Sequence, residues 1–105
     1  MKKAFIFPGQ GSQYVGMGLD FYESLKLVKD KYIIASEILG YDIAKISFYD
    51  QDNNLNETKY TQPAIFIHSV IINDILKEKQ ILPNAVAGHS LGEFSALYSA
   101  NVLSF

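Results

Sequence analysis

The sequence predicts an α/β fold with parallel strands, and three observations support this prediction. Two short apolar segments, residues 3–7 and 84–87, have the length and composition of buried strands. The chain between them carries helical patterns, which gives the alternating order of an α/β protein. A G-x-S-x-G motif follows the second segment directly and is typical of a sharp turn from a strand into a helix.

The first predicted strand, Lys3–Phe7, is ended by Pro8. A glycine-rich loop follows it, with glycines at positions 9, 11, 16 and 18. Asp20 is expected to cap a helix over residues 21–27, because a short acidic side chain can accept the free N–H groups at a helix start.

A second helix is predicted over residues 29–39, with Gly40 as its C-cap. Ile43, Ile46 and Phe48 then indicate a short amphipathic segment. Residues 50–54 are all polar and are expected to form a loop.

Thr61 is expected to cap the strongest helix, residues 62–78, with Pro63 in its first turn, where the missing N–H costs little. Apolar side chains surround most of this helix, which is typical of a helix packed on several sides. Pro83 separates it from the second strand. No linker or internal repeat divides residues 1–105, so one domain is expected.

Residues 88–92 carry the chemistry that the sequence suggests. Gly88 and Gly92 permit a tight turn, and Ser90 between them is expected to present its hydroxyl at the turn. The helix predicted from residue 93 directs free N–H groups and a positive partial charge towards an oxyanion formed at that hydroxyl. The motif therefore predicts acyl transfer through an ester on Ser90.

Composition excludes several other classes. All nine basic residues are lysines, and the net charge of −2 argues against a nucleic-acid partner. The absence of cysteine excludes disulfides, thiol catalysis and thiolate metal sites, and no metal or cofactor is expected. No apolar run approaches the length of a membrane span, so no membrane association and a cytoplasmic location are expected.

Three motifs together resemble one family. Residues 7–13, 60–64 and 87–97 resemble, in order and separation, the opening, second and nucleophile motifs of malonyl-CoA:acyl-carrier-protein transacylases. The resemblance implies the N-terminal part of a three-layer α/β/α, hydrolase-like acyltransferase domain, with an incomplete sheet and without the smaller subdomain. It also implies fatty-acid synthesis as the setting, with malonyl-CoA and the phosphopantetheine thiol of acyl carrier protein as partners.

The resemblance assigns roles to individual residues. Ser90 resembles the serine that carries the malonyl group, and the backbone N–H groups of Gln10 and Leu91 resemble the oxyanion-hole donors. Supporting positions are implied at glycines 9, 11, 88 and 92, at Gln62 and at His89.

The family's base and its carboxylate-binding arginine follow the serine in the chain, and neither has a counterpart in residues 1–105. His89 is expected to support the turn rather than act as the base, and His68 to pack in the core. The sequence is therefore interpreted as an N-terminal fragment of the acyltransferase domain that is inactive alone.

Two alternatives remain. A serine esterase or lipase shares the G-x-S-x-G turn, but its second oxyanion donor comes from the loop after the third strand, not the first. A catalytically inert truncated piece is the other alternative, because a serine hydroxyl without a base is a poor nucleophile.

Overall fold

The computed structural model describes residues 2–105 and confirms the α/β prediction. The strands are β1 (Ala4–Phe7) and β2 (Ala85–Gly88), and the helices are α1 (Leu19–Ser24), α2 (Lys26–Leu39), α3 (Ile43–Phe48), α4 (Thr58–Glu78) and α5 (Gly92–Ser99). No helix within residues 2–105 combines the length and the apolar content needed to cross a lipid bilayer.

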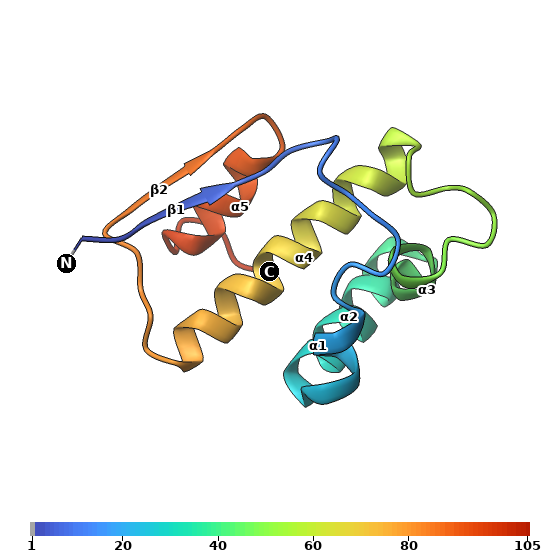
Figure 1. Cartoon of the computed structure of the whole chain (residues 1–105), viewed down its shortest axis with the longest axis horizontal. Helices are drawn as coiled ribbons and strands as arrows, with labels where there is room; N and C mark the ends of the chain where they lie inside the picture. Colours follow the sequence, from blue (N-terminus) through green and yellow to red (C-terminus); the bar gives the residue numbers. More distant parts are fainter. Residues whose placement is uncertain (1) are drawn as a thin grey trace.

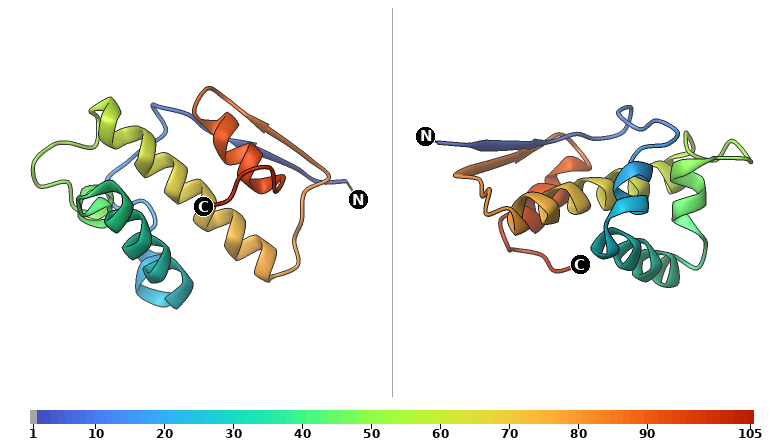
Figure 2. Two further views of the ribbon diagram at one scale, coloured as in Figure 1. Left: turned by 180° about the vertical axis from the view of Figure 1, so that it is seen from behind. Right: turned by 60° about the horizontal axis from the view of Figure 1, so that its bottom comes forward.

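The two strands form a parallel sheet in which Ala4 lies beside Ala85 and Phe7 beside Gly88. Helices α4 and α5 lie on one face of this sheet, and no helix of the described residues covers the other face (Figures 1 and 2). Helices α2 and α3 pack against the far side of α4, and α1 packs against α2 (Figure 1). The sheet is therefore small and incomplete, as predicted.

The strands and the last helix lie close to their predicted bounds. β1 begins one residue later than predicted, and β2 is shifted by one residue, from 84–87 to 85–88. Asn84 lies just before β2. Its amide oxygen accepts the backbone N–H of Lys3 at 2.8 Å, and this bond holds the starts of the two strands together.

The predicted cap at Asp20 is wrong. Asp20 lies inside the first turn of α1, and Gly18, at φ 86°, occupies the cap position without a side-chain hydrogen bond. The carboxylate of Asp20 accepts the N–H of its neighbour Phe21 instead. The first two helices also meet earlier than predicted, because extended Leu25 ends α1 and α2 begins at Lys26.

The second helix and the short amphipathic segment are confirmed. Gly40 ends α2 in the left-handed conformation at φ 82°. Asp42 caps α3, and its carboxylate accepts the N–H of Lys45 at 3.1 Å. Ile43 and Phe48 point into the core, so α3 is amphipathic, as its sequence indicates.

Helix α4 begins at Thr58, four residues earlier than predicted, so Thr61 is not its cap. The Thr61 hydroxyl is buried and donates back to the carbonyls of Leu55 and Glu57 instead. Pro63 consequently lies inside the helix, where its missing N–H leaves one carbonyl of the first turn without its usual donor.

The core lies between α2, α3 and the middle of α4. Tyr22, Tyr32 and Phe48 contact one another edge to face, with ring centroids 5.1–5.8 Å apart. A polar network also joins three helices: the Lys31 ammonium lies 3.0 Å from the Asp74 carboxylate, and the Tyr98 hydroxyl donates to that carboxylate at 2.8 Å. These contacts fix α2, α4 and α5 relative to one another.

Candidate active site

Ser90 lies in a tight turn between β2 and α5. Its φ of 56° is in the left-handed region, which is uncommon for a residue with a side chain and is found where the surrounding structure forces it. The residue is exposed, and within residues 2–105 its hydroxyl makes no hydrogen bond. The strand, turn and helix predicted around Ser90 are therefore confirmed, and the hydroxyl is free.

Glycines 88 and 92 are required by close backbone packing. A Cβ on Gly88 would collide with the carbonyl of Gly92, and a Cβ on Gly92 would collide with the carbonyl of Phe7. The first turn of α5 thus lies directly against the ends of both strands. No side chain larger than hydrogen fits at either position without moving the helix away from the sheet.

The loop after β1 lies against this turn. A Cβ on Gly9 would stand 2.5 Å from the carbonyl oxygen of His89, so Gly9 and the residue before Ser90 are in backbone contact. The backbone N–H of His89 donates to Phe7 at 3.1 Å, and its carbonyl accepts the N–H of Gly92 at 3.0 Å. The structure therefore packs the glycine loop against the turn that carries Ser90.

Side chains hold this loop on the start of α4. The Gln10 amide donates to the Thr58 hydroxyl at 3.1 Å, and the Gln13 amide donates to Asn56 at 2.8 Å. The amide oxygen of Gln13 accepts the N–H of Gly11, where φ is +109°. The sequence analysis assigned no structural role to Gln13, Asn56 or Thr58. The one signal for these contacts was the pair of polar residues after Gly11, Ser12 and Gln13.

Two backbone donors, one in the loop after β1 and one at the start of α5, are unused. Among residues 2–105, no acceptor takes the N–H of Gln10 or of Leu91. Leu91 is also the first residue before α5, whose N-terminal end carries the positive partial charge of the helix dipole. An anion beside Ser90 would meet this charge and a free amide.

An apolar groove of about 710 Å³ opens beside the turn, lined by Leu91, Phe94, Phe66 and Gln62 among others. Gln62 belongs to α4 and is exposed, so the structure places it in the groove that also contains Leu91. Lys59 is the one charged side chain among the residues that line this groove. Its lining suits an apolar group bound beside the turn.

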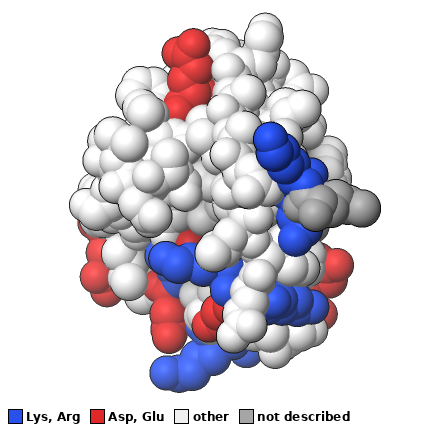
Figure 3. Space-filling model, turned by 90° about the vertical axis from the view of Figure 1, so that its left-hand side faces the viewer, with Lys and Arg blue, Asp and Glu red and all other residues white. Residues whose placement is uncertain are grey.

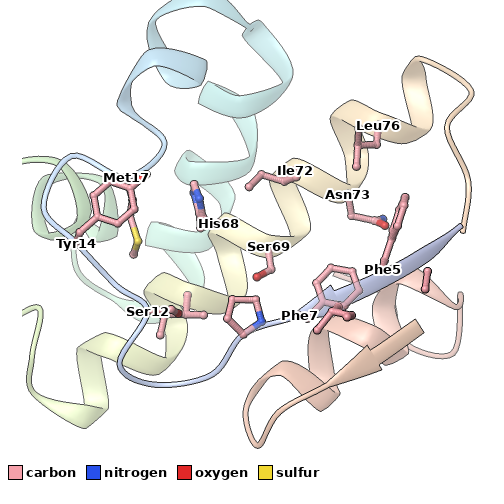
Figure 4. Close-up of a pocket in the computed structure, with 14 residues that line it drawn as sticks. Phe5, Phe7, Ser12, Tyr14, Met17, His68, Ser69, Ile72, Asn73 and Leu76 are labelled. Carbon is pink, nitrogen blue, oxygen red and sulfur yellow. The ribbon is translucent and has the colours of Figure 1, made fainter. Parts of the chain in front are cut away.

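Neither histidine is placed as a base for Ser90. The side chain of His89 lies beside Gly9, with Nδ1 3.6 Å from the point a Cβ there would occupy. His68 lies on α4 and faces the loop at Gly18 and Met17, where its Nδ1 is buried without a hydrogen-bond partner among residues 2–105 (Figure 4). Burial lowers the pKa of His68, and the nearby Asp20 carboxylate opposes this shift.

Comparison with known proteins places this geometry in a family. The family model for the acyl transferase domain matches residues 4–105. The malonyl CoA-acyl carrier protein transacylase of Synechocystis is 48% identical over 105 residues, and its crystal structure superposes with a TM-score of 0.93 over 100% of this chain. The Streptococcus pneumoniae MCAT structure is 51% identical, with a TM-score of 0.87 over 93% of this chain and 32% of that chain.

A third solved structure shows a malonyl-transacylase in complex with the holo form of a type II polyketide synthase acyl-carrier protein. It is 42% identical, with a TM-score of 0.89 over 95% of this chain and 33% of that chain. Residues 1–105 span about a third of the length of these proteins, 35% in the case of the Synechocystis relative.

Proposed function

The chain belongs to the acyl transferase domain family, and we propose from this premise that it forms the nucleophile part of a malonyl-CoA:acyl-carrier-protein transacylase. The observation that carries the proposal is Ser90. Its hydroxyl is free at a left-handed turn between β2 and α5, and the glycine loop is packed against that turn. We interpret this turn as a nucleophile elbow.

The proposed reaction has two transfers. In the first, the Ser90 oxygen attacks the thioester carbon of malonyl-CoA, its proton passes to a base, and the C–S bond breaks to release the coenzyme A thiol. In the second, the phosphopantetheine thiol of acyl carrier protein attacks the malonyl ester, and the C–O bond breaks to regenerate Ser90. An ester intermediate divides one difficult transfer into two easier ones.

The backbone amides of Leu91 and Gln10 are the proposed oxyanion donors. Both N–H groups are unused within residues 2–105, and the contact of Gly9 with His89 brings the Gln10 loop to the turn. Preorganised donors of this kind contribute about 10²–10³ in rate each. Gly11 and its partner Gln13 support the loop, and Gln62 borders the apolar groove beside the turn.

The base and the cation for the malonyl carboxylate are proposed to belong to the part of the domain that residues 1–105 do not span. His68 faces Gly18, and His89 lies beside Gly9, so we assign the base to neither. The sequence offers no arginine. In this proposal the 105 residues are an N-terminal part of the domain, working in the cytoplasm and inactive without the remainder.

A serine hydrolase is disfavoured by the position of the glycine loop. The loop that contacts the Ser90 turn follows β1, whereas hydrolases with this motif take the second donor from the loop after their third strand.

The test uses a chimera in which this chain replaces the matched segment of the Synechocystis relative. With malonyl-CoA we expect one malonyl ester by intact mass, mapped to Ser90 and lost in Ser90→Ala. The control Ser104→Ala changes an exposed serine away from the turn and should retain the ester. A folded chimera without the ester, or with fast hydrolysis of simple esters and no transfer to acyl carrier protein, would overturn the proposal.

A further inference from the structure

The segments that form the Ser90 turn carry no lysine or arginine. Residues 8–13 and 88–99 contain neither, and the acidic residue Glu93 lies in the first turn of α5. Figure 3 faces the end of the molecule where the strands begin, and lysines and carboxylates gather in the lower part of that face and along one margin. Ser90 follows the other end of β2. Within the turn and its loop, stabilisation of a negative charge therefore depends on how the backbone amides are aimed.

The amide of Gln10 belongs to a peptide unit that is fixed in position and needs a restraint on its rotation. The contact of Gly9 with the His89 carbonyl fixes where this unit begins. Gly9 and Gly11 flank Gln10, and glycine allows backbone rotations that other residues resist. Because the peptide is trans and planar, its N–H points opposite to its C=O. Holding the Gly9 carbonyl therefore aims the Gln10 N–H.

Ser12 holds that carbonyl. Its hydroxyl donates to the Gly9 carbonyl oxygen at 2.8 Å, and its backbone N–H donates to the same oxygen at 3.4 Å. The N–H contact is longer than an ordinary N–H···O bond, so the hydroxyl is the stronger restraint. Ser12 lies in the loop after β1 (Figure 4) and is exposed, so its contribution comes from the hydroxyl bond rather than from packing.

The next peptide unit is held as well. The amide oxygen of Gln13 accepts the N–H of Gly11 at 2.7 Å, and its amide nitrogen donates to Asn56 at 2.8 Å. Side chains of the same loop therefore restrain both peptide units that adjoin Gln10. The N–H of Gln10 itself has no acceptor among residues 2–105, so it is available to a ligand.

We propose that Ser12 is a positioning residue for acyl transfer, because its hydroxyl bond to the Gly9 carbonyl aims the Gln10 N–H at the oxyanion. The inference rests on the proposed function, in which Gln10 is an oxyanion donor. In this role Ser12 touches no reacting atom and acts through the peptide between Gly9 and Gln10. A bond accepted by the carbonyl also polarises the peptide, which strengthens its N–H as a donor. Because the oxyanion is absent from bound substrate, the hydroxyl should affect kcat and not KM.

The first test measures malonyl transfer by variants of the chimera. Ser12→Ala should lower kcat roughly 10-fold with KM unchanged, which is less than the cost of about 10²–10³ for losing an oxyanion donor. The effect is smaller because the backbone N–H of Ser12 still donates to the Gly9 carbonyl. Ser12→Thr keeps a hydroxyl at an exposed position and should retain the unaltered kcat.

The matched control is Ser36→Ala. The Ser36 hydroxyl accepts the N–H of Ile43 at 3.2 Å, and Ser36 lies on α2, away from the Ser90 turn. Its loss should lower the thermal midpoint and leave kcat unchanged. All rates are compared at a temperature where every variant is folded, so a change in kcat reports on the site and not on stability.

The second test observes the peptide itself, without substrate. In a chimera whose glutamines carry an isotopic nitrogen label, Ser12→Ala should shift the amide resonance of Gln10, and Ser12→Thr and Ser36→Ala should leave it in place. This readout separates two failures. An unaltered chimera that forms no ester on Ser90 would refute the proposed function, whereas a Gln10 resonance that ignores Ser12→Ala would refute the bond that the inference needs.

Three kinetic results would also overturn the inference. Ser12→Ala could transfer malonyl groups with an unaltered kcat. It could raise KM instead of lowering kcat, which would indicate a contact with bound substrate. Ser12→Thr could be as slow as Ser12→Ala, or Ser36→Ala could be as slow, and either result would indicate a general structural effect.

Discussion

Replacing Gly9 with alanine should separate the geometry of the glycine loop from the stability of the fold. The added Cβ would stand 2.5 Å from the carbonyl oxygen of His89, and ordinary van der Waals contact begins at 3.4 Å. The two backbones must therefore separate by about 0.9 Å. The His89 carbonyl is restrained from rotating away, because it accepts the N–H of Gly92 at 3.0 Å.

The displacement should reach the proposed oxyanion donor at Gln10, which follows Gly9 directly. A shift of about 1 Å in a catalytic group costs on the order of 10²-fold in rate, and losing one oxyanion donor costs about 10²–10³. We therefore expect Gly9→Ala to lower kcat/KM of the chimera roughly 100-fold, or about 2.7 kcal/mol of transition-state stabilisation. The fold should lose about 1–3 kcal/mol from the overpacked contact.

The assay is malonyl transfer to acyl carrier protein, measured at a temperature where each variant is fully folded. The matched control is Gly40→Ala, which places a Cβ at φ 82° with no atom within 4 Å. It should cost about 1 kcal/mol of stability and leave kcat/KM unchanged. If Gly9→Ala transfers malonyl groups at the rate of the unaltered chimera, the loop does not position the donor and the reasoning fails.

Three further predictions concern stability. Asp74→Asn should cost about 1–2 kcal/mol by denaturant unfolding, because it weakens partly buried contacts to Lys31 and Tyr98, whereas Asp30→Asn in an exposed pair should cost less than about 0.5 kcal/mol. Because burial lowers the pKa of His68, the unfolded chain takes up a proton near pH 6.5 and the folded chain only at lower pH. The free energy of unfolding should therefore fall as the pH drops below about 6.5, and His68→Gln should remove this part of the pH dependence. A His68→Gln chain whose stability varies with pH as that of the unaltered chain does would contradict the prediction. The isolated chain should unfold over a broad temperature range because its sheet is incomplete, and a sharp two-state transition would count against this.

The parts of the fold that local sequence determines could be predicted. Pro8 and the four apolar residues before it specify β1, Gly40 specifies the end of α2, and the two glycines around Ser90 specify the strand–turn–helix unit. Each of these features depends on a residue whose own backbone preference permits few alternatives.

The parts that depend on distant residues could not be predicted. The sequence predicts a helix from Gln62 with Thr61 as its cap, because a threonine followed by a proline in the first turn is typical of a helix start. The Thr61 hydroxyl instead turns back to Leu55 and Glu57, and the helix begins at Thr58. Likewise, Gln10 and Thr58 are 48 positions apart, and nothing in the sequence pairs them. The roles of Ser90, Gln10 and Leu91 in catalysis stay predictions until the chimera is assayed.

The parallel pairing of Ala4 with Ala85 has a consequence for the order of folding during synthesis. Of the described elements β1 leaves the ribosome before the others, and its partner β2 follows 81 positions later. At typical elongation rates of about 5–20 residues per second, this interval lasts several seconds. Helices α1–α4 can pack together in that time, because their contacts are closer in sequence. The β1 strand stays unpaired until β2 is made, and its phenylalanines remain accessible to chaperones. Among the described elements, the strand translated earliest therefore forms its sheet hydrogen bonds late.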